Sequence, residues 1–140
     1  MKPASFDVPW LFRLGASLGL ANTVEGIALT LSGIAFLGLG GNAGKIYIFG
    51  FAYLVLAGVF NLLIVRERHH FWESRPSNLL VITVAAEILI VCAVSLVGFL
   101  ELSPIGVLPL VVLLAFSAVA SFAVNNRLKV FLLRRFSGGR

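Results

Sequence analysis

Charged residues are scarce in this sequence: only 12% of its 140 residues are Asp, Glu, Lys or Arg, against about a quarter in a typical soluble domain. Hydrophobic residues make up 59% of the chain, and the mean hydropathy is +1.02. A chain of this length has too little interior to hide so much apolar surface from water. The composition therefore argues against a water-soluble enzyme, a nucleic-acid reader or a disordered chain, and it indicates a protein whose main solvent is lipid.

Residues and motifs that carry chemistry are also missing. Cys92 is the single cysteine and lies in an apolar run, which excludes a disulfide framework and a thiolate metal site. Neither histidine, His69 or His70, lies in an apolar run, which argues against a haem held between helices. The sequence has no phosphate-binding glycine loop, no Ser/His/Asp set and no HExxH motif. It therefore predicts no catalytic residue, no metal and no cofactor.

Long apolar runs dominate what is present. A helix needs about 20 apolar residues to cross a bilayer, and these runs are continuous rather than alternating, which predicts helices and not barrel strands. We expect an all-α membrane protein of four transmembrane helices in two hairpins. The predicted parts are a segment 1–13, a bundle 14–126 with spans at about 14–39, 46–65, 79–100 and 105–124, and a basic tail 127–140.

The positive charges lie at one set of helix ends. Ten of them flank the same side of the predicted bundle, and Lys45 alone flanks the other. Basic residues concentrate on the cytoplasmic side of membrane proteins. The sequence therefore predicts a multi-pass protein of the plasma membrane with both termini in the cytoplasm, and the net charge of +5 is an orientation signal that implies no nucleic-acid partner. The ten residues are Lys2, Arg13, Arg66, Arg68, Arg75, Arg127, Lys129, Arg134, Arg135 and Arg140.

Glu25 and Glu87 are the acidic residues that lie deep inside the apolar runs. At about 1.5 Å of rise per residue, they sit at comparable depths from the predicted cytoplasmic side. A charge at the bilayer centre costs about 2.5–3.5 kcal/mol on insertion scales, so the neutral acid is favoured. Two interpretations stay open: a protonated acid that hydrogen-bonds to a helix of this chain or a partner, or a proton relay or part of a cation pathway.

Glycines within the first apolar run offer faces for close helix packing. Gly15 and Gly19 have the GxxxG spacing, and Gly26 and Gly33 lie seven residues apart. Small residues at such spacings allow helix backbones to approach one another. We expect these four residues to pack helices, either within the bundle or against a partner.

Basic and aromatic residues lie together in the loop 66–78 and in the tail. Aromatic rings favour the headgroup level of a bilayer, and guanidinium groups bind lipid phosphates. The sequence therefore predicts contact with anionic lipid headgroups. The residues expected to make it are Arg66, Arg68, Phe71, Trp72, Arg75, Arg134 and Arg135.

The loop is also more specific than a generic cytoplasmic connection. Its sequence over 65–77, Val-Arg-Glu-Arg-His-His-Phe-Trp-Glu-Ser-Arg-Pro-Ser, resembles the link between the eighth and ninth membrane helices of P-type ATPases, closest to the proton-exporting branch. In that branch an Arg-x-Arg group, an aromatic residue and Arg-Pro lead into the ninth helix. Residues 102–106 and 124–129 are similar to the turn and exit of the tenth helix. With Lys2, Pro3 and Trp10 before the first span, the resemblance covers nearly all 140 residues, as helices seven to ten.

The resemblance implies a support bundle that buttresses a transport core. The sequence lacks the Asp-Lys-Thr-Gly-Thr phosphorylation motif, the nucleotide and actuator domains, and helices four to six, where the family holds its main transport site, so no catalytic residue carries over. If another chain supplies the rest of the pump, the assembly would couple ATP hydrolysis to cation export. The alternative is an independent small membrane protein, either an accessory subunit of an unrelated complex or a small oligomeric transporter that uses Glu25 and Glu87. Expected partners are another membrane chain or further copies of this one.

Overall fold

The computed structural model describes residues 8–66 and 75–137, and this part of the chain is helical with no β-strand. Four stretches are long and apolar enough to cross a membrane: Leu11–Phe36, Ala43–Val65, Asn78–Val97 and Val107–Arg135. The predicted all-α class with four spanning helices is therefore confirmed. The elements in chain order are α1 (Val8–Phe36), η1 (Leu39–Gly41), α2 (Ala43–Val65), α3 (Asn78–Val97), α4 (Val107–Val119), the π-helical turn η2 (Ala120–Asn125) and α5 (Asn126–Ser137).

The turn between α1 and α2 is set by glycine and asparagine. The first helix ends at Phe36, three residues before the predicted limit, and Gly38 then adopts the left-handed conformation with φ 68°. Glycine pays no steric cost there because it has no Cβ. Asn42 caps α2, since its side chain accepts a hydrogen bond from the Gly44 backbone N–H at 2.8 Å.

The turn between α3 and α4 is longer than the sequence predicts. Ser77 caps the start of α3 by accepting a hydrogen bond from the Leu80 N–H. The helix stops at Val97 rather than near residue 100, because Gly98 and Leu100 adopt positive φ values of 79° and 55°. Gly106, with φ 84°, delays the start of α4 to residue 107.

The predicted end of the fourth span, near residue 124, is not where the helix ends. α4 continues through η2 into α5, so a helix runs from Val107 to Ser137. Much of the expected basic tail is therefore helical and belongs to the bundle. The physical reason is that the π-helical turn keeps the backbone hydrogen-bonded while it changes the direction of the side chains.

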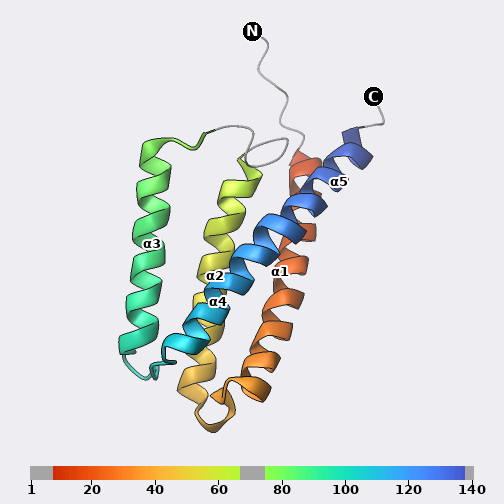
Figure 1. The fold of residues 1–140 in the computed structure, drawn as a ribbon. Helices are drawn as coiled ribbons and strands as arrows, with labels where there is room; N and C mark the ends of the chain where they lie inside the picture. Colours follow the sequence, from red (N-terminus) through yellow and green to blue (C-terminus); the bar gives the residue numbers. More distant parts are fainter. Residues whose placement is uncertain (1–7, 67–74, 138–140) are drawn as a thin grey trace.

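α2 lies at the centre of the bundle and packs against α1, α3, α4 and η2. Its side chains Ile48, Phe49 and Leu56 have no exposed surface. The start of α1, the end of α5, the end of α2 and the start of α3 all lie at one end of the bundle, and the two turns lie at the other (Figure 1). α3 lies at the edge of the bundle (Figure 1), and most of its residues are exposed.

Aromatic contacts join the central helix to the continuous fourth helix. The rings of Tyr53 and Phe116 have centroids 6.3 Å apart, and those of Phe60 and Phe122 are 5.2 Å apart. At the turn end, Asn42 Nδ2 donates to Ser103 Oγ at 3.1 Å. These contacts hold α2 against α4 and η2, and this arrangement determines where the polar side chains inside the bundle meet.

Candidate functional site

Five polar side chains from three segments meet inside the bundle, and we refer to them as the polar cluster. Asn125 of η2 lies at its centre. Its Nδ2 donates to Asn22 Oδ1 at 2.8 Å, and it lies 3.4 Å from Glu25 Oε2 and 3.4 Å from Asn61 Oδ1. The amide therefore connects η2 with α1 and α2 through side chains that are far apart in the sequence. The fifth member is Tyr53 of α2.

Tyr53 places a hydroxyl beside the carboxyl group of Glu25. The Tyr53 oxygen lies 3.2 Å from Glu25 Oε2 and 3.2 Å from the backbone oxygen of Asn22. The close approach depends on Gly26, because a Cβ at that position would lie 2.6 Å from Cε1 of the Tyr53 ring. The Glu25 carboxyl therefore has two hydrogen-bond donors, one from α2 and one from η2.

The π-helical turn explains how Asn125 reaches the cluster. Successive residues of an α-helix point about 100° apart, yet Asn125 and its neighbour Asn126 both have no exposed surface. A π-helical turn inserts a residue into the helical repeat and is frequent at functional sites. Within the described residues, Asn125 Oδ1 is buried and accepts no hydrogen bond. It is a polar atom that the bundle itself does not satisfy.

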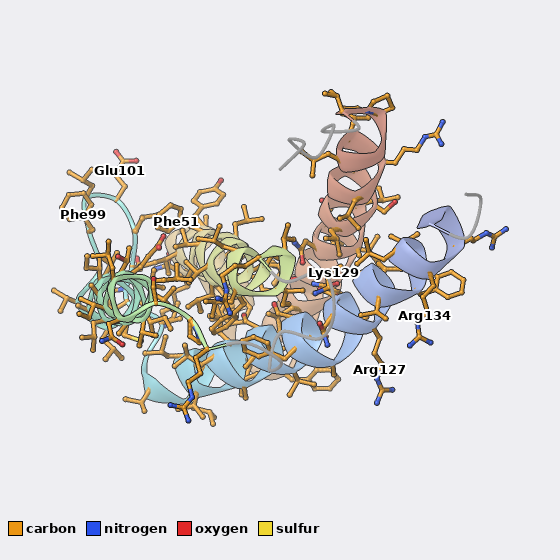
Figure 2. The ribbon with its side chains drawn as sticks, turned by 90° about the horizontal axis from the view of Figure 1, so that it is seen from above. Phe51, Phe99, Glu101, Arg127, Lys129 and Arg134 are labelled. Atoms are coloured by element: carbon orange, nitrogen blue, oxygen red, sulfur yellow. The ribbon has the colours of Figure 1, made fainter. Side chains whose placement is uncertain are left out.

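Lys129 of α5 is buried rather than exposed at the surface. Its Nζ donates to the backbone oxygen of Ile64 at 2.7 Å, and only 1% of the residue is exposed. Ile64 belongs to the last turn of α2, whose carbonyl groups lack partners within the helix and carry the negative end of its dipole. Figure 2 shows Lys129 on the inner side of α5, whereas Arg127 and Arg134 point away from the bundle.

The two acids that the sequence singled out lie apart. Glu25 is partly buried in the polar cluster, where its carboxyl group accepts a hydrogen bond from Tyr53 of the neighbouring helix α2. Glu87 is exposed near the middle of α3, and it makes no hydrogen bond or ion pair with any part of the chain that the structure describes. The fold therefore brings only one of the two predicted acids into contact with other polar groups.

The four predicted packing glycines also fall into two groups, one inside the bundle and one outside it. Gly26 and Gly33 lie where α1 approaches α2, and a Cβ at Gly33 would lie 2.7 Å from Leu39 Cδ1 and 3.2 Å from Phe49 Cε1. At Gly15 and Gly19 nothing lies within 4 Å of an added Cβ. The first pair packs helices within this bundle, and the second pair faces outward.

Some of the residues predicted to contact lipid headgroups lie in the part of the chain that the structure describes. Arg66 and Arg75 are exposed, and Arg66 Nη1 donates to the Arg75 backbone oxygen at 3.2 Å. Arg134 and Arg135 are exposed in the last turn of α5. Their lipid contact stays a prediction. Arg68, Phe71 and Trp72 lie outside the described residues, as do His69 and His70.

Sequence reasoning singled out Glu25, but it predicted neither the contacts that form the polar cluster nor the burial of Lys129. Asn22 and Asn61 were visible as polar interruptions of apolar runs, but Tyr53, Asn125 and Lys129 gave no sign that they would turn inward. The described residues contain no group of three or more His, Cys, Asp or Glu side chains that could hold a metal ion. With one carboxyl, one phenol and three amides, the cluster can hold helices together or hold a proton.

No family model, no curated protein and no solved structure matches this chain. The geometry of the polar cluster and the outward-facing residues therefore carry the functional argument.

Proposed function

We propose that this chain is a membrane-embedded support bundle with no catalytic chemistry of its own, and that it buttresses the transport core of a cation-exporting P-type ATPase. The observation that carries the support role is the engagement of Glu25 Oε2 by donors from both α2 and η2. Hydrogen bonds between helices stabilise their association in lipid. The carboxyl group thus serves to hold α1, α2 and η2 in one arrangement.

Two further observations support a partner chain. The face of α1 that carries Gly15 and Gly19 has open space beside both residues, which is the geometry that a closely packed helix of another chain requires. The resemblance of residues 65–77 to the loop before the ninth helix of proton-exporting P-type ATPases supports the identity of that partner. The transport core would lie outside the 140 residues of this chain.

The arrangement of helix ends supports the proposed orientation. The start of α1, the end of α5, the end of α2 and the start of α3 lie at one end of the bundle (Figure 1). Arg66 directly follows α2, and Arg75 lies three residues before α3, so both basic residues belong to this end. We infer a plasma-membrane protein with this end in the cytoplasm. In a Cys92→Ser background, an impermeant thiol reagent applied outside whole cells should label Lys45→Cys and should leave Arg134→Cys unlabelled. The opposite pattern would overturn the orientation.

The support role is tested by purification of the tagged chain in a mild detergent. We expect a second membrane chain that carries the phosphorylation sequence to be recovered with it, together with ATPase activity. The double variant Gly15→Leu, Gly19→Leu should lose that chain, while Leu31→Ala, on another exposed position of α1, should retain it. Recovery of this chain alone without ATPase activity would overturn the pump assignment.

A small proton transporter is the second candidate, and the buried Asn125 Oδ1 without a hydrogen bond favours it. This oxygen sits on the amide that contacts Glu25, so the cluster contains a hydrogen-bond acceptor beside a carboxyl group that can hold a proton. Proton flux through vesicles that contain only this chain, abolished by Glu25→Gln, would favour the transporter over the support bundle.

A further inference from the structure

Three side-chain oxygens surround the amide nitrogen of Asn125. Asn22 Oδ1 lies 2.8 Å from Asn125 Nδ2, while Glu25 Oε2 and Asn61 Oδ1 each lie 3.4 Å from it. An amide nitrogen carries two hydrogens, so it cannot give each of the three oxygens a hydrogen of its own. The oxygens therefore outnumber the hydrogens that Asn125 directs at them.

The oxygen of the same amide lacks a partner. Asn125 has no exposed surface, and its Oδ1 accepts no hydrogen bond from any residue that the structure describes. A buried polar atom in this situation is unfavourable, and a bound ion or water molecule is a common reason for one. The amide thus directs its donor at three acceptors and leaves its acceptor unused.

A half turn of this amide directs four oxygens at one another. Rotation about the Cβ–Cγ bond exchanges Oδ1 and Nδ2 of an asparagine, whose two ends are nearly equal in shape. Asn125 Oδ1 then faces the same three oxygens from the position that Nδ2 has in the structure. Oxygens that face one another repel, so this orientation is favourable only with a positive charge between them.

We infer that the polar cluster binds one sodium ion, which is held by the carboxylate of Glu25 and by the amide oxygens of the three asparagines. A hard cation of this size takes oxygen ligands at about 2.3–2.6 Å, so neighbouring ligands at right angles lie about 3.3–3.7 Å apart. The two distances of 3.4 Å match this spacing, and Asn22, at 2.8 Å, moves slightly outward. One acid is enough, because amide oxygens also bind hard cations.

The charge of the cluster favours a monovalent ion. Glu25 is the one carboxyl group among its five side chains, so a sodium ion makes the site neutral. A divalent ion leaves a net positive charge inside the membrane, where charge is costly. Lys129, four residues after Asn125 on the same continuous helix, adds a positive charge to this side of the bundle and disfavours a divalent ion further.

The site lies close to the basic end of the bundle. Asn61 is four residues before Val65, the last residue of α2, which is about 6 Å along a helix. Asn22, Glu25 and Asn61 are all partly exposed, so the ion reaches them from this end. The inference goes beyond the proposed support role, which needs no ion, and it uses contacts within this chain alone. The absence of a pump partner would leave it intact.

Thermal melts of the purified full chain in mild detergent test the ion. The chlorides of sodium, potassium and choline are compared at equal ionic strength and mildly alkaline pH, where protons compete least for Glu25. Sodium well above its dissociation constant should raise the melting temperature by about 3–8 °C over choline. Potassium should raise it much less, because its longer bonds need a wider ring of oxygens. Equal melting temperatures in sodium and choline would overturn the site, and equal shifts in sodium and potassium would overturn its assignment to sodium.

Two matched substitutions locate the ion. Glu25→Gln should lose the sodium shift but melt like the wild type in choline, because its amide oxygen still accepts from Tyr53. Glu87→Gln makes the same change at an exposed position of α3 and should keep the shift. Binding of radioactive sodium should be about tenfold weaker or less in Glu25→Gln, which lacks the charged ligand. A sodium shift of equal size in Glu25→Gln, or no sodium bound by the wild type, would refute the inference.

Discussion

The side-chain amide of Asn125 donates a hydrogen bond to Asn22 Oδ1 at 2.8 Å across a sequence separation of 103 residues. This contact joins η2, in the last spanning helix, to the middle of the first. Inside a bilayer there is no water to replace such a bond. The pair therefore links the first spanning helix to the last, and it brings Glu25 and Asn61 into the same hydrogen-bond network.

The first prediction concerns this amide. Asn125→Ala removes the donor shared by Asn22, Glu25 and Asn61, and it should lower the free energy of unfolding by about 1–3 kcal/mol because partly buried acceptors lose a hydrogen bond. Unfolding in mixed detergent micelles, followed by circular dichroism, measures the loss. The control is Thr23→Ala, whose exposed hydroxyl donates to the Gly19 backbone oxygen of its own helix. A loss of equal size in both variants would contradict a central role for Asn125.

The second prediction separates the shape of Glu25 from its charge. Glu25→Gln keeps an oxygen that accepts from Tyr53, so we expect the melting temperature in detergent to change little. Glu25→Leu removes the acceptor and leaves the buried Tyr53 hydroxyl with one partner fewer, so it should destabilise the protein by about 1–3 kcal/mol. If the glutamine variant loses as much stability as the leucine variant, the carboxylate itself and not its hydrogen-bond acceptor holds the bundle together.

The third prediction tests the buried lysine. Lys129→Met keeps the length of the side chain but removes the hydrogen bond to Ile64 O, and charged hydrogen bonds contribute about 1.5–3 kcal/mol. Hydrogen exchange should accelerate selectively in the last turn of α2, which loses its cap. Arg127→Met, on the exposed side of α5, is the matched control and should leave that exchange unchanged. Uniform acceleration across all helices would instead indicate global destabilisation.

The fourth prediction concerns the packing glycines. Gly26→Ala places a Cβ 2.6 Å from the Tyr53 ring, so the ring must move, and overpacking of this kind costs about 1–3 kcal/mol. Gly15→Ala meets no atom within 4 Å and should be neutral or stabilising by up to about 1 kcal/mol, because alanine favours helix. Thermal melts of the two variants in detergent compare them directly. Equal melting temperatures would show that the α1–α2 contact tolerates a methyl group at Gly26.

Several elements follow from local sequence alone. The apolar runs predict four helices because a bilayer leaves a continuous apolar segment little other choice, and the caps at Asn42 and Ser77 follow from short polar side chains at helix starts. The predicted end of α3 was three residues too late and the predicted start of α4 was two residues too early. Gly98 and Gly106 set these two limits, and their positive φ values depend on how the turn packs against its neighbours. The resemblance of residues 65–77 to P-type ATPases stays a prediction.

The sequence by itself determined that this chain is a four-helix membrane protein, and it identified Glu25 and Glu87 as the acidic residues that lie deep inside the apolar runs. Only the tertiary structure decided that Glu25 contacts Tyr53 and Asn125 while Glu87 faces outward. The physical reason is that lipid is as apolar as the interior of the bundle. Apolar side chains therefore cover both faces of a spanning helix, and hydrophobic periodicity does not reveal which face turns inward. The π-helical turn added a change of direction before Lys129 that no periodic pattern encodes.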